Sequence, residues 1–219
     1  MSWLTPTLQD LLVEALWETA IMVGASAAIA VAFGLPLALL LHVTAPGGLS
    51  PNAWLNRPLG LVVNAARSTP FIILMVAIVP FTRLVAGTSI GTGAAVVPLA
   101  LAATAFLARL FENALREVDA GVIEAARAMG ATRLQIVAKV LVPEALPGLI
   151  AATTVALVSL VGFSAMAGAV GGGGLGDLGI RFGYQRFMPE VMATVVVILI
   201  VLVQGLQSFG DWLVRRLSH

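Results

Sequence analysis

The chain has 219 residues, of which 59% are hydrophobic and 11% are charged, and its formal net charge is +1. Soluble domains carry about 25% charged residues, so this composition excludes a soluble globular fold and predicts helices buried in a lipid bilayer. The near-neutral charge argues against a nucleic-acid partner, and the absence of cysteine excludes disulfides and thiolate metal sites. The histidines, His42 and His219, lie far apart in the chain, which argues against a metal site.

The first expected span runs from about residue 20 to 41, and no basic residue precedes Arg57. Because a cleaved signal peptide begins with a basic region, we expect this apolar segment to remain as a transmembrane helix. Pro36 lies inside the segment and is tolerated in membrane helices. The run Ala45-Pro46-Gly47-Gly48 predicts a loop after it.

The second expected span covers about residues 59–81, although Arg67 interrupts its apolar character. We expect Arg67 near the start of this helix, where a long basic side chain can reach the membrane surface. The glycine-rich run 87–93 predicts the next loop. The third expected span covers about residues 94–110.

A polar segment, 112–144, follows the third span and contains the clearest local signals in the chain. Asp119 is expected to cap a short helix that ends before Gly130. Thr132, with Gln135 three residues later, predicts a capping box at the start of a second helix. We expect Pro143 to end that second helix before the chain re-enters the membrane.

The short helix at 119–130 has a surface suited to docking against another protein. Its alanines allow a partner protein to approach closely, and three larger apolar residues supply contact with that partner. One acid and one base can fix the position of the helix against the partner. The alternative is an amphipathic helix lying on lipid headgroups, which would show bulky apolar anchors and a strongly basic face; this helix has neither. The predicted docking residues are Asp119, Val122, Ile123, Glu124, Ala125, Ala126, Arg127, Met129 and Gly130.

The fourth and fifth expected spans cover about residues 146–167 and 191–209, with a flexible glycine-rich turn, 168–179, between them. Five spans place the termini on opposite sides of the membrane. With the N-terminus outside and the C-terminus cytoplasmic, nine basic residues fall on or near the cytoplasmic side and three outside, as the positive-inside rule requires.

The segment Glu124-Ala125-Ala126, followed by Gly130 and Val140-Leu141-Val142-Pro143, resembles the EAA motif of binding-protein-dependent ABC importer permeases. The family pattern ends in Ile-x-Leu-Pro, so Val140 and Val142 are conservative departures. In that family the short helix docks in a groove on the ATP-binding subunit and carries its motion into the membrane. The resemblance therefore implies that residues 119–130 form a coupling helix.

Five other segments are similar to the methionine importer permease subfamily: Arg67 to Leu74, Pro80 to Arg83, Gly87 to Gly91, Glu112 to Leu115 and Val161 to Met166. Together the resemblance covers roughly residues 15–212. It implies one all-α transmembrane domain, 1–219, of the type I ABC importer permease fold in the bacterial inner membrane. That fold has five transmembrane helices, with the cytoplasmic coupling helix between spans three and four. The implied cargo is methionine.

The resemblance also implies the partners. Five helices are few for enclosing an amino-acid path, so we expect a homodimer with the path at the subunit interface. Two ABC ATPase subunits would carry ATP and Mg, and an extracytoplasmic substrate-binding protein or lipoprotein would deliver the solute. This chain is expected to bind no cofactor and to be no enzyme, because it lacks a phosphate-binding loop and its one lysine, Lys139, follows no glycine-rich turn.

Two groups of residues are weaker candidates. The first is expected to line or gate the path: Ser68, Ser159, Ser164 and Met166. Small polar residues that only pack between helices are the alternative for the serines, and Met166 replaces the second glycine that a nucleophile elbow needs. The second group is expected to contact the binding protein, with solvated or headgroup-facing charge as the alternative: Arg83, Arg181 and Arg186.

Three other functions remain open. The same class of permease could carry another amino acid, a dipeptide or a phosphonate, although an oxyanion path should show more basic residues inside the membrane. A secondary transporter would work without an ATPase, but the expected spans lack central charges for an ion relay. A membrane enzyme is disfavoured because no nucleophile, base and orienting group occur together.

Overall fold

The computed structural model describes residues 6–217, so His219 lies outside the described residues, and all regular structure in this range is helical. The α-helices are α1 (Pro6–Thr44), α2 (Ala53–Ser68), α3 (Phe71–Ala77), α4 (Val79–Ala86), α5 (Thr92–Arg116), α6 (Ala120–Ala128), α7 (Arg133–Ile136), α8 (Val142–Ala167), α9 (Gly174–Leu178) and α10 (Pro189–Leu217). Three π-helical segments join or extend them: Val137–Leu141, Gly168–Gly172 and Gly179–Tyr184.

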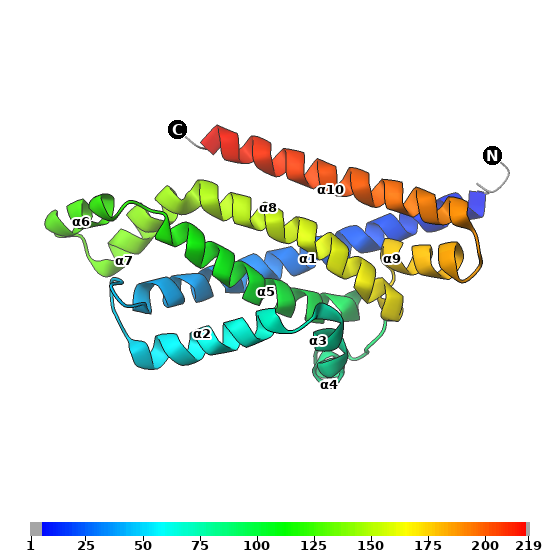
Figure 1. The fold of residues 1–219 in the computed structure, drawn as a ribbon, viewed down its shortest axis with the longest axis horizontal. Helices are drawn as coiled ribbons and strands as arrows, with labels where there is room; N and C mark the ends of the chain where they lie inside the picture. Colours follow the sequence, from blue (N-terminus) through cyan, green and yellow to red (C-terminus); the bar gives the residue numbers. More distant parts are fainter. Residues whose placement is uncertain (1–5, 218–219) are drawn as a thin grey trace.

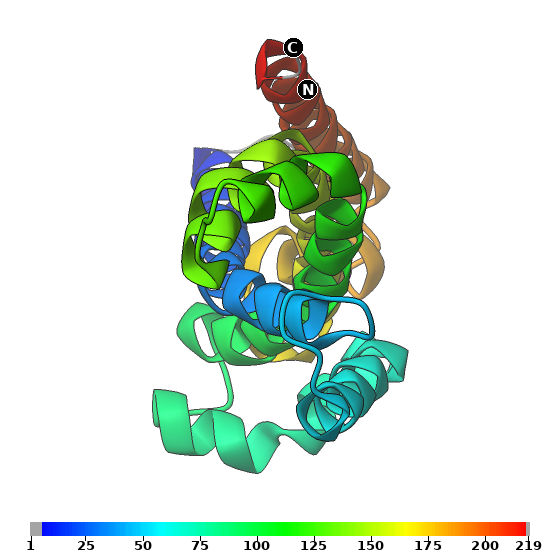
Figure 2. The ribbon, with the colours of Figure 1, turned by 90° about the vertical axis from the view of Figure 1, so that its left-hand side faces the viewer.

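Helices α1, α5, α8 and α10 run along the long axis of the molecule (Figure 1). α5 packs against α1 and α8, and α10 packs against α8. Seen from the end that carries α6, α10 lies at one side of the bundle and α2 to α4 lie at the opposite side (Figure 2). Within residues 6–217, four helices are long and apolar enough to cross a membrane, and the bent pair α2 and α3 provides a fifth crossing if it is counted as one span. The expected all-α architecture is confirmed, and the expected number of five spans is reached when the bent pair is counted as one span.

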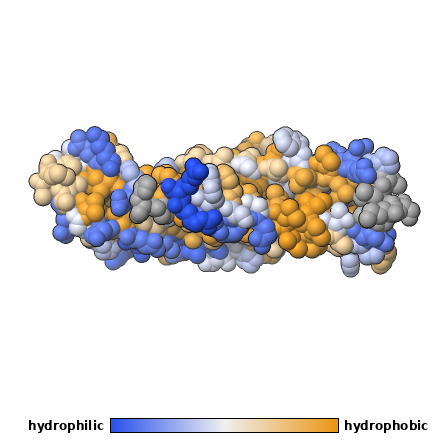
Figure 3. Space-filling model, turned by 90° about the horizontal axis from the view of Figure 1, so that it is seen from above, coloured by the Kyte–Doolittle hydropathy of each residue, from blue (hydrophilic) through white to orange (hydrophobic). Residues whose placement is uncertain are grey.

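The surface matches a protein that sits in a bilayer. Seen from above, a strongly hydrophilic patch lies between the middle of the molecule and the end that carries α6, further hydrophilic residues lie at both ends, and a hydrophobic area lies toward the end that carries α9 (Figure 3). Large apolar side chains such as Phe33, Leu61 and Val201 are more than half exposed. Lipid can cover such side chains, whereas water would oppose their exposure.

The interior of the bundle is built largely from small residues. Alanines of α1, α5 and α8 make up much of the buried cluster, together with larger side chains such as Met22, Leu107 and Phe111. Gly34 lets α1 approach α5, because a Cβ atom there would lie 3.3 Å from that of Leu107. Close approach of helices through small residues is the usual way of packing within a membrane.

The expected second span, 59–81, is wrong as a single helix. α2 already begins at Ala53, where the Asn52 side chain accepts hydrogen bonds from two backbone N–H groups, and α2 ends at Ser68. α3 then continues at an angle of 107° to α2. The cause is Pro70, which forces Thr69 into an extended conformation (φ −82°, ψ 125°). Arg67 consequently lies exposed in the last turn of α2 and not near the start of a helix.

The expected loop 112–144 is shorter than predicted at both ends. Residues 112–116 form the last turns of α5, which ends at Arg116. Pro143 does not end a helix; it is the second residue of α8, inside a helical run that continues from Arg133 to Gly172. The π-helical turns Val137–Leu141 carry the chain from α7 directly into α8.

The expected flexible turn, 168–179, is also wrong. It folds into π-helical turns and α9, and Gly172, Gly174, Leu175 and Leu178 are buried. Glycine is used here for close packing: a Cβ atom on Gly168 would lie 2.5 Å from the backbone nitrogen of Asp177. The run therefore folds back tightly on itself, which residues with side chains could not do.

Candidate functional site: the α6 hairpin and its buried support

The helix expected to couple to a partner, α6, is defined by caps at both ends. The Asp119 carboxylate accepts a hydrogen bond from the Gly121 N–H at 2.6 Å. After α6, Gly130 adopts φ +80°, a conformation that L side chains rarely take. The predicted capping box of α7 is present, because the Thr132 N–H donates to Gln135 Oε1 and the Gln135 N–H donates to Thr132 Oγ1. These local predictions from the sequence are confirmed.

One face of α6 rests on the rest of the chain. Ala126 is 3% exposed and packs with Leu49 and Ile136, and Ile123 is partly buried in the same cluster. These two members of the expected docking surface therefore face inward. An alanine at position 126 allows this close contact because it has almost no side chain.

The opposite face of α6 is free. Met129 is 82% exposed and Val122 is 40% exposed, although neither carries a charge that would favour water. The other exposed members of the expected docking surface are Asp119, Glu124, Ala125, Arg127 and Gly130. These exposed apolar and charged residues belong to a hairpin, α6 and α7, that lies at one end of the bundle (Figures 1 and 2).

A hollow of about 560 Å³ lies beside α6, between the loop after α1 and the end of α5. His42 and Pro46 line it from the α1 side, and Arg116 lines it from α5. Glu124 and Arg127 of α6 complete the wall. Charged groups of both signs therefore face a recess that is large enough to accept a side chain of a partner.

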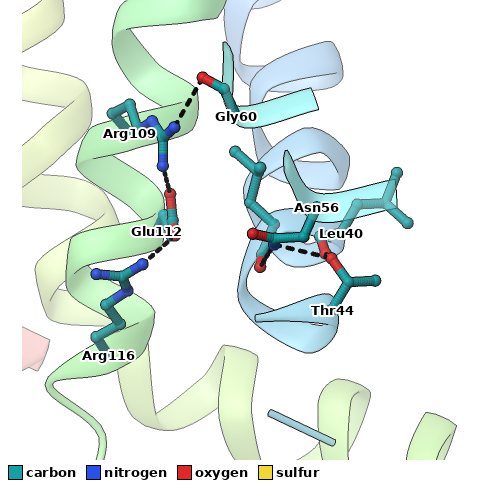
Figure 4. A network of polar contacts seen from close by, with 8 residues as sticks. Leu40, Thr44, Asn56, Gly60, Arg109, Glu112 and Arg116 are labelled. Atoms are coloured by element: carbon teal, nitrogen blue, oxygen red, sulfur yellow. Dashed lines mark hydrogen bonds and ion pairs between the residues drawn. The ribbon is translucent and has the colours of Figure 1, made fainter. Parts of the chain in front are cut away.

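One turn before Arg116 on α5, Glu112 forms a buried ion-pair network (Figure 4). Its side chain is 2% exposed, and its carboxylate accepts from Arg109 at 2.6 Å and from Arg116 at 2.5 Å. Arg109 also donates to the backbone carbonyl of Gly60 on α2 at 3.0 Å. A buried carboxylate is stable only when such partners compensate it.

A second polar contact holds α2 against α1. The Asn56 amide donates to the Leu41 carbonyl at 2.7 Å and to Thr44 Oγ1 at 3.0 Å. Thr44 donates in turn to the Leu40 carbonyl (Figure 4). Since α5 leads directly into α6, these contacts join the segment before α6 to both α1 and α2. A force applied to α6 would therefore reach three helices of the bundle.

The residues expected to line the path are not brought together. Ser164 is buried inside the bundle and donates to the Val161 carbonyl, and Ser159 is half-buried. Ser68 lies exposed at the end of α2, and Met166 is 48% exposed on α8. Ser164 packs inside one protomer, which is the alternative that the sequence left open. A path role for the other three stays a prediction.

The three arginines expected to contact a binding protein are exposed. Arg83 donates from Nε to Ser89 Oγ, and Arg181 pairs with Asp177 at 2.9 Å. The Arg181 and Arg186 guanidinium groups lie 5.3 and 4.3 Å from the centre of the Phe182 ring. Arg181 and Arg186 therefore form one cluster beyond α9, separate from Arg83.

Sequence reasoning missed Arg109, Glu112 and Glu18 as structural charges. Glu112 was assigned to a polar loop, although its spacing of three and four residues from Arg109 and Arg116 is that of ion pairs on one helix face. Glu18 precedes the expected first span, and no neighbour in the sequence indicates a partner for it. Its partners at residues 92 and 174 are too distant in the chain for any spacing rule to find.

Comparison with known proteins yields consistent matches. Residues 34–219 match the family model described as "Binding-protein-dependent transport system inner membrane component". The chain is 57% identical over 210 residues to the "Probable D-methionine transport system permease protein MetI" of Vibrio cholerae, covering 96% of this chain and 93% of that protein. It is 46% identical to a protein of the same name from Pasteurella multocida, covering 99% and 100%.

Solved structures agree with these matches. A chain of "Inward facing conformations of the MetNI methionine ABC transporter" in its native crystal form superposes with a TM-score of 0.97 at 51% identity, covering 99% of this chain and 100% of that one. A chain of an amino acid ABC transporter crystallised with histidines gives a TM-score of 0.81 at 20% identity, covering 96% and 95%. The latter likeness concerns the fold alone.

Proposed function

This chain belongs to the family of inner membrane components of binding-protein-dependent transport systems, and from this premise we propose that it is the permease subunit of an ATP-driven methionine importer. The observation that carries the proposal is α6, a capped helix with one face free and the other packed on the rest of the chain through Ala126, close after α5, whose Arg109 bonds to α2. The names of its relatives support methionine as the cargo. We propose that both the D and L forms are carried.

The chain acts as one half of a homodimer, with two separate ABC ATPase subunits that bind ATP and Mg. Each α6 docks on one ATPase through Val122, Glu124, Arg127 and Met129, which are exposed. ATP binding closes the ATPase pair and draws the two α6 helices together. Because only residues 117–119 separate α5 from α6, and α5 is bonded to α2 through Arg109 and Gly60, the bundles rotate as bodies and the path opens outward; hydrolysis reverses the motion.

The end of the bundle with α6 faces the cytoplasm, and the end with α9 faces outward. This orientation places six basic residues of the α6 end inside, namely Arg116, Arg127, Arg133, Lys139, Arg215 and Arg216. Arg181 and Arg186, near α9, lie outside. The orientation follows the positive-inside rule. The arginine cluster beyond α9, together with Arg83, then forms the docking surface for an extracytoplasmic binding protein.

The path itself serves to lower a large barrier. A zwitterionic amino acid cannot enter hydrocarbon without losing the hydration of both charges, which costs several kcal/mol each. A transient polar cavity between two protomers removes that cost. Ser68, Ser159 and Met166 are the residues of this chain that we propose to line or gate it, since each has some exposure at the protomer surface.

The proposal is tested by purifying the tagged chain with its co-expressed partners and measuring ATPase activity and methionine uptake in proteoliposomes. Charge reversal by Glu124→Lys should weaken ATPase co-purification or reduce uptake per ATP about tenfold, the factor for one charged contact. Glu190→Lys is the matched control, because Glu190 is exposed at the opposite end of the bundle. Normal coupling in Glu124→Lys, or uptake without any ATPase, would count against the proposal.

A further inference from the structure

The glycine-rich segment 168–184 is held against α1 by a carboxylate. Glu18 Oε2 accepts a hydrogen bond from the Gly174 N–H at 2.6 Å, and Glu18 Oε1 accepts one from Thr92 Oγ1 at 3.2 Å. Glu18 lies 156 residues before Gly174 in the chain. One side chain of α1 therefore joins the first residue of α9 to the first residue of α5.

Two further hydrogen bonds fasten the same segment. The Leu175 N–H donates to Thr19 Oγ1 at 2.9 Å, next to the Glu18 contact. On the other side, the Gly91 N–H donates to the Gly171 carbonyl at 2.8 Å. The segment is thus tied to α1 and to the turn before α5, and Figure 1 shows α9 lying against α1.

The glycines are required for this contact. Gly173 and Gly174 adopt φ +79° and +75°, where L side chains are strained. A Cβ atom on Gly173 would lie 2.7 Å from Glu18 Oε2, and one on Gly174 would lie 2.7 Å from Thr19 Oγ1. The backbone can reach the carboxylate only because side chains are absent at both positions.

The surrounding charges leave Glu18 free for this task. Glu14, Asp177 and Arg181 line the same hollow of about 300 Å³. Arg181 pairs with Asp177 at 2.9 Å, so the local cation is engaged elsewhere. The Glu18 carboxylate is therefore satisfied by N–H and O–H groups.

We propose that Glu18 is a positioning residue for transport, which latches segment 168–184 onto α1 and keeps the outer end of the path closed in the inward-facing arrangement. The inference rests on the proposed function, which places this end outside. The structure superposes on chains from inward-facing transporters, in which the outer end must be the closed one. Segment 168–184 lies at that end, and Glu18 is the charged group among its attachments to α1 and to the start of α5.

The test uses a buried reporter, since the chain contains no cysteine. Leu175→Cys places a thiol at a position that is 0% exposed within the latched segment. Its rate of maleimide labelling is measured in the assembled complex in detergent. Adding Glu18→Ala should speed the labelling at least about tenfold, because a hydrogen bond to a charged group no longer opposes local opening. In proteoliposomes, Glu18→Ala alone should lower methionine uptake per ATP hydrolysed.

Two controls make the result specific. Glu14→Ala removes an exposed acid one turn earlier, whose side chain makes no hydrogen bond within residues 6–217. This variant should leave the labelling rate of Leu175→Cys unchanged. A second reporter, Leu160→Cys, lies in the main core at 1% exposure and should stay unlabelled with Glu18→Ala, which separates local opening from unfolding. The latch is overturned if Glu18→Ala leaves the labelling rate of Leu175→Cys unchanged. It is also overturned if Glu14→Ala raises that rate equally, or if Glu18→Ala raises the labelling of Leu160→Cys equally.

If the complex with Glu18→Ala does not assemble, Glu18→Gln tests the latch in its place. It keeps one oxygen acceptor but removes the charge, so labelling should rise by a smaller factor, about threefold or more. A rate equal to that of the parent overturns the proposal. Labelling in detergent does not depend on sidedness or on transport, so a failed latch leaves the importer function standing, and a failed importer function leaves the labelling result readable.

Discussion

At the scale of single residues, the main finding is that the few charges near the membrane helices are structural. Glu112 is nearly fully buried between two arginines, and Glu18 is held by a backbone N–H and a threonine. Neither acid has a titratable partner arranged for proton transfer. Glu18 connects helices that are distant in the sequence, and Glu112 pairs with Arg109, which bonds to Gly60 of α2.

Replacing Glu112 should destabilise the chain strongly. Glu112→Ala leaves the half-buried Arg109 without its anion, and breaking such a pair costs about 3 kcal/mol or more. The ion pair of Glu112 with Arg116 contributes less to stability, because the Arg116 side chain is 56% exposed and screened by solvent. The measurement is the midpoint of thermal denaturation of the detergent-solubilised complex.

Glu117→Ala is the matched control for that experiment. Glu117 is exposed and makes no ion pair within the described residues, so its loss should change stability by less than about 0.5 kcal/mol. Equal midpoints for the two variants would show that the buried network does not support the end of α5.

At the scale of elements, α10 is the helix with the least burial. This holds among the four long apolar helices, since only 11% of the residues in its most apolar window are buried; its contacts are mainly with α8 and with the π-helical turns Gly179–Tyr184. The approach of α10 to α8 is closest at Gly210, where a Cβ atom would overlap the side chain of Thr154. One glycine therefore sets the spacing of two long helices.

Gly210→Ala should push α10 away from α8 and cost about 1–3 kcal/mol, as overpacking usually does. Gly205→Ala lies on the same helix with no atom within 4 Å of the new methyl group, so it should be neutral or stabilise by up to about 1 kcal/mol. Thermal denaturation of the solubilised complex compares the two. Adding Thr154→Ala should restore part of the loss in Gly210→Ala, and a lack of rescue would refute the steric explanation.

At the scale of the whole molecule, the two ends of the bundle have different tasks. One end carries the α6 hairpin with its exposed apolar and charged face, and the other carries α9 and the arginine cluster (Figure 1). The long helices between them are held at the first end by Glu112 and at the second by Glu18. A transporter that passes motion from one end to the other needs such stiff connections.

The orientation of the chain can be tested with two exposed reporters. Met129 is 82% exposed on the α6 side and Tyr184 is 72% exposed beyond α9. In intact cells that express the chain without an ATPase subunit, an impermeant maleimide should label Tyr184→Cys but not Met129→Cys, and permeabilised cells should show both. The cysteine-free parent chain should show no labelling. The reverse pattern would invert the proposed orientation and place α6 beyond the reach of an ATPase.

The sequence by itself determined the membrane class, the positions of four of the long helices and the caps of the α6 hairpin. These features depend on composition and on spacings of a few residues, so they can be read without knowing the fold. The break at Pro70 was also present in the sequence as a signal, because a proline restricts the residue before it. It was missed because the apolar run continues across it.

Only the tertiary structure decided which residues the helices bring together. The burial of Glu112, the bond from Arg109 to Gly60, and the contact of Glu18 with Gly174 join residues up to 156 positions apart. The same holds for the inward-facing side of α6 and for the glycine-rich segment, which folds only because α1 lies against it. Such contacts depend on the register in which helices pack, and no local pattern in the chain encodes that register.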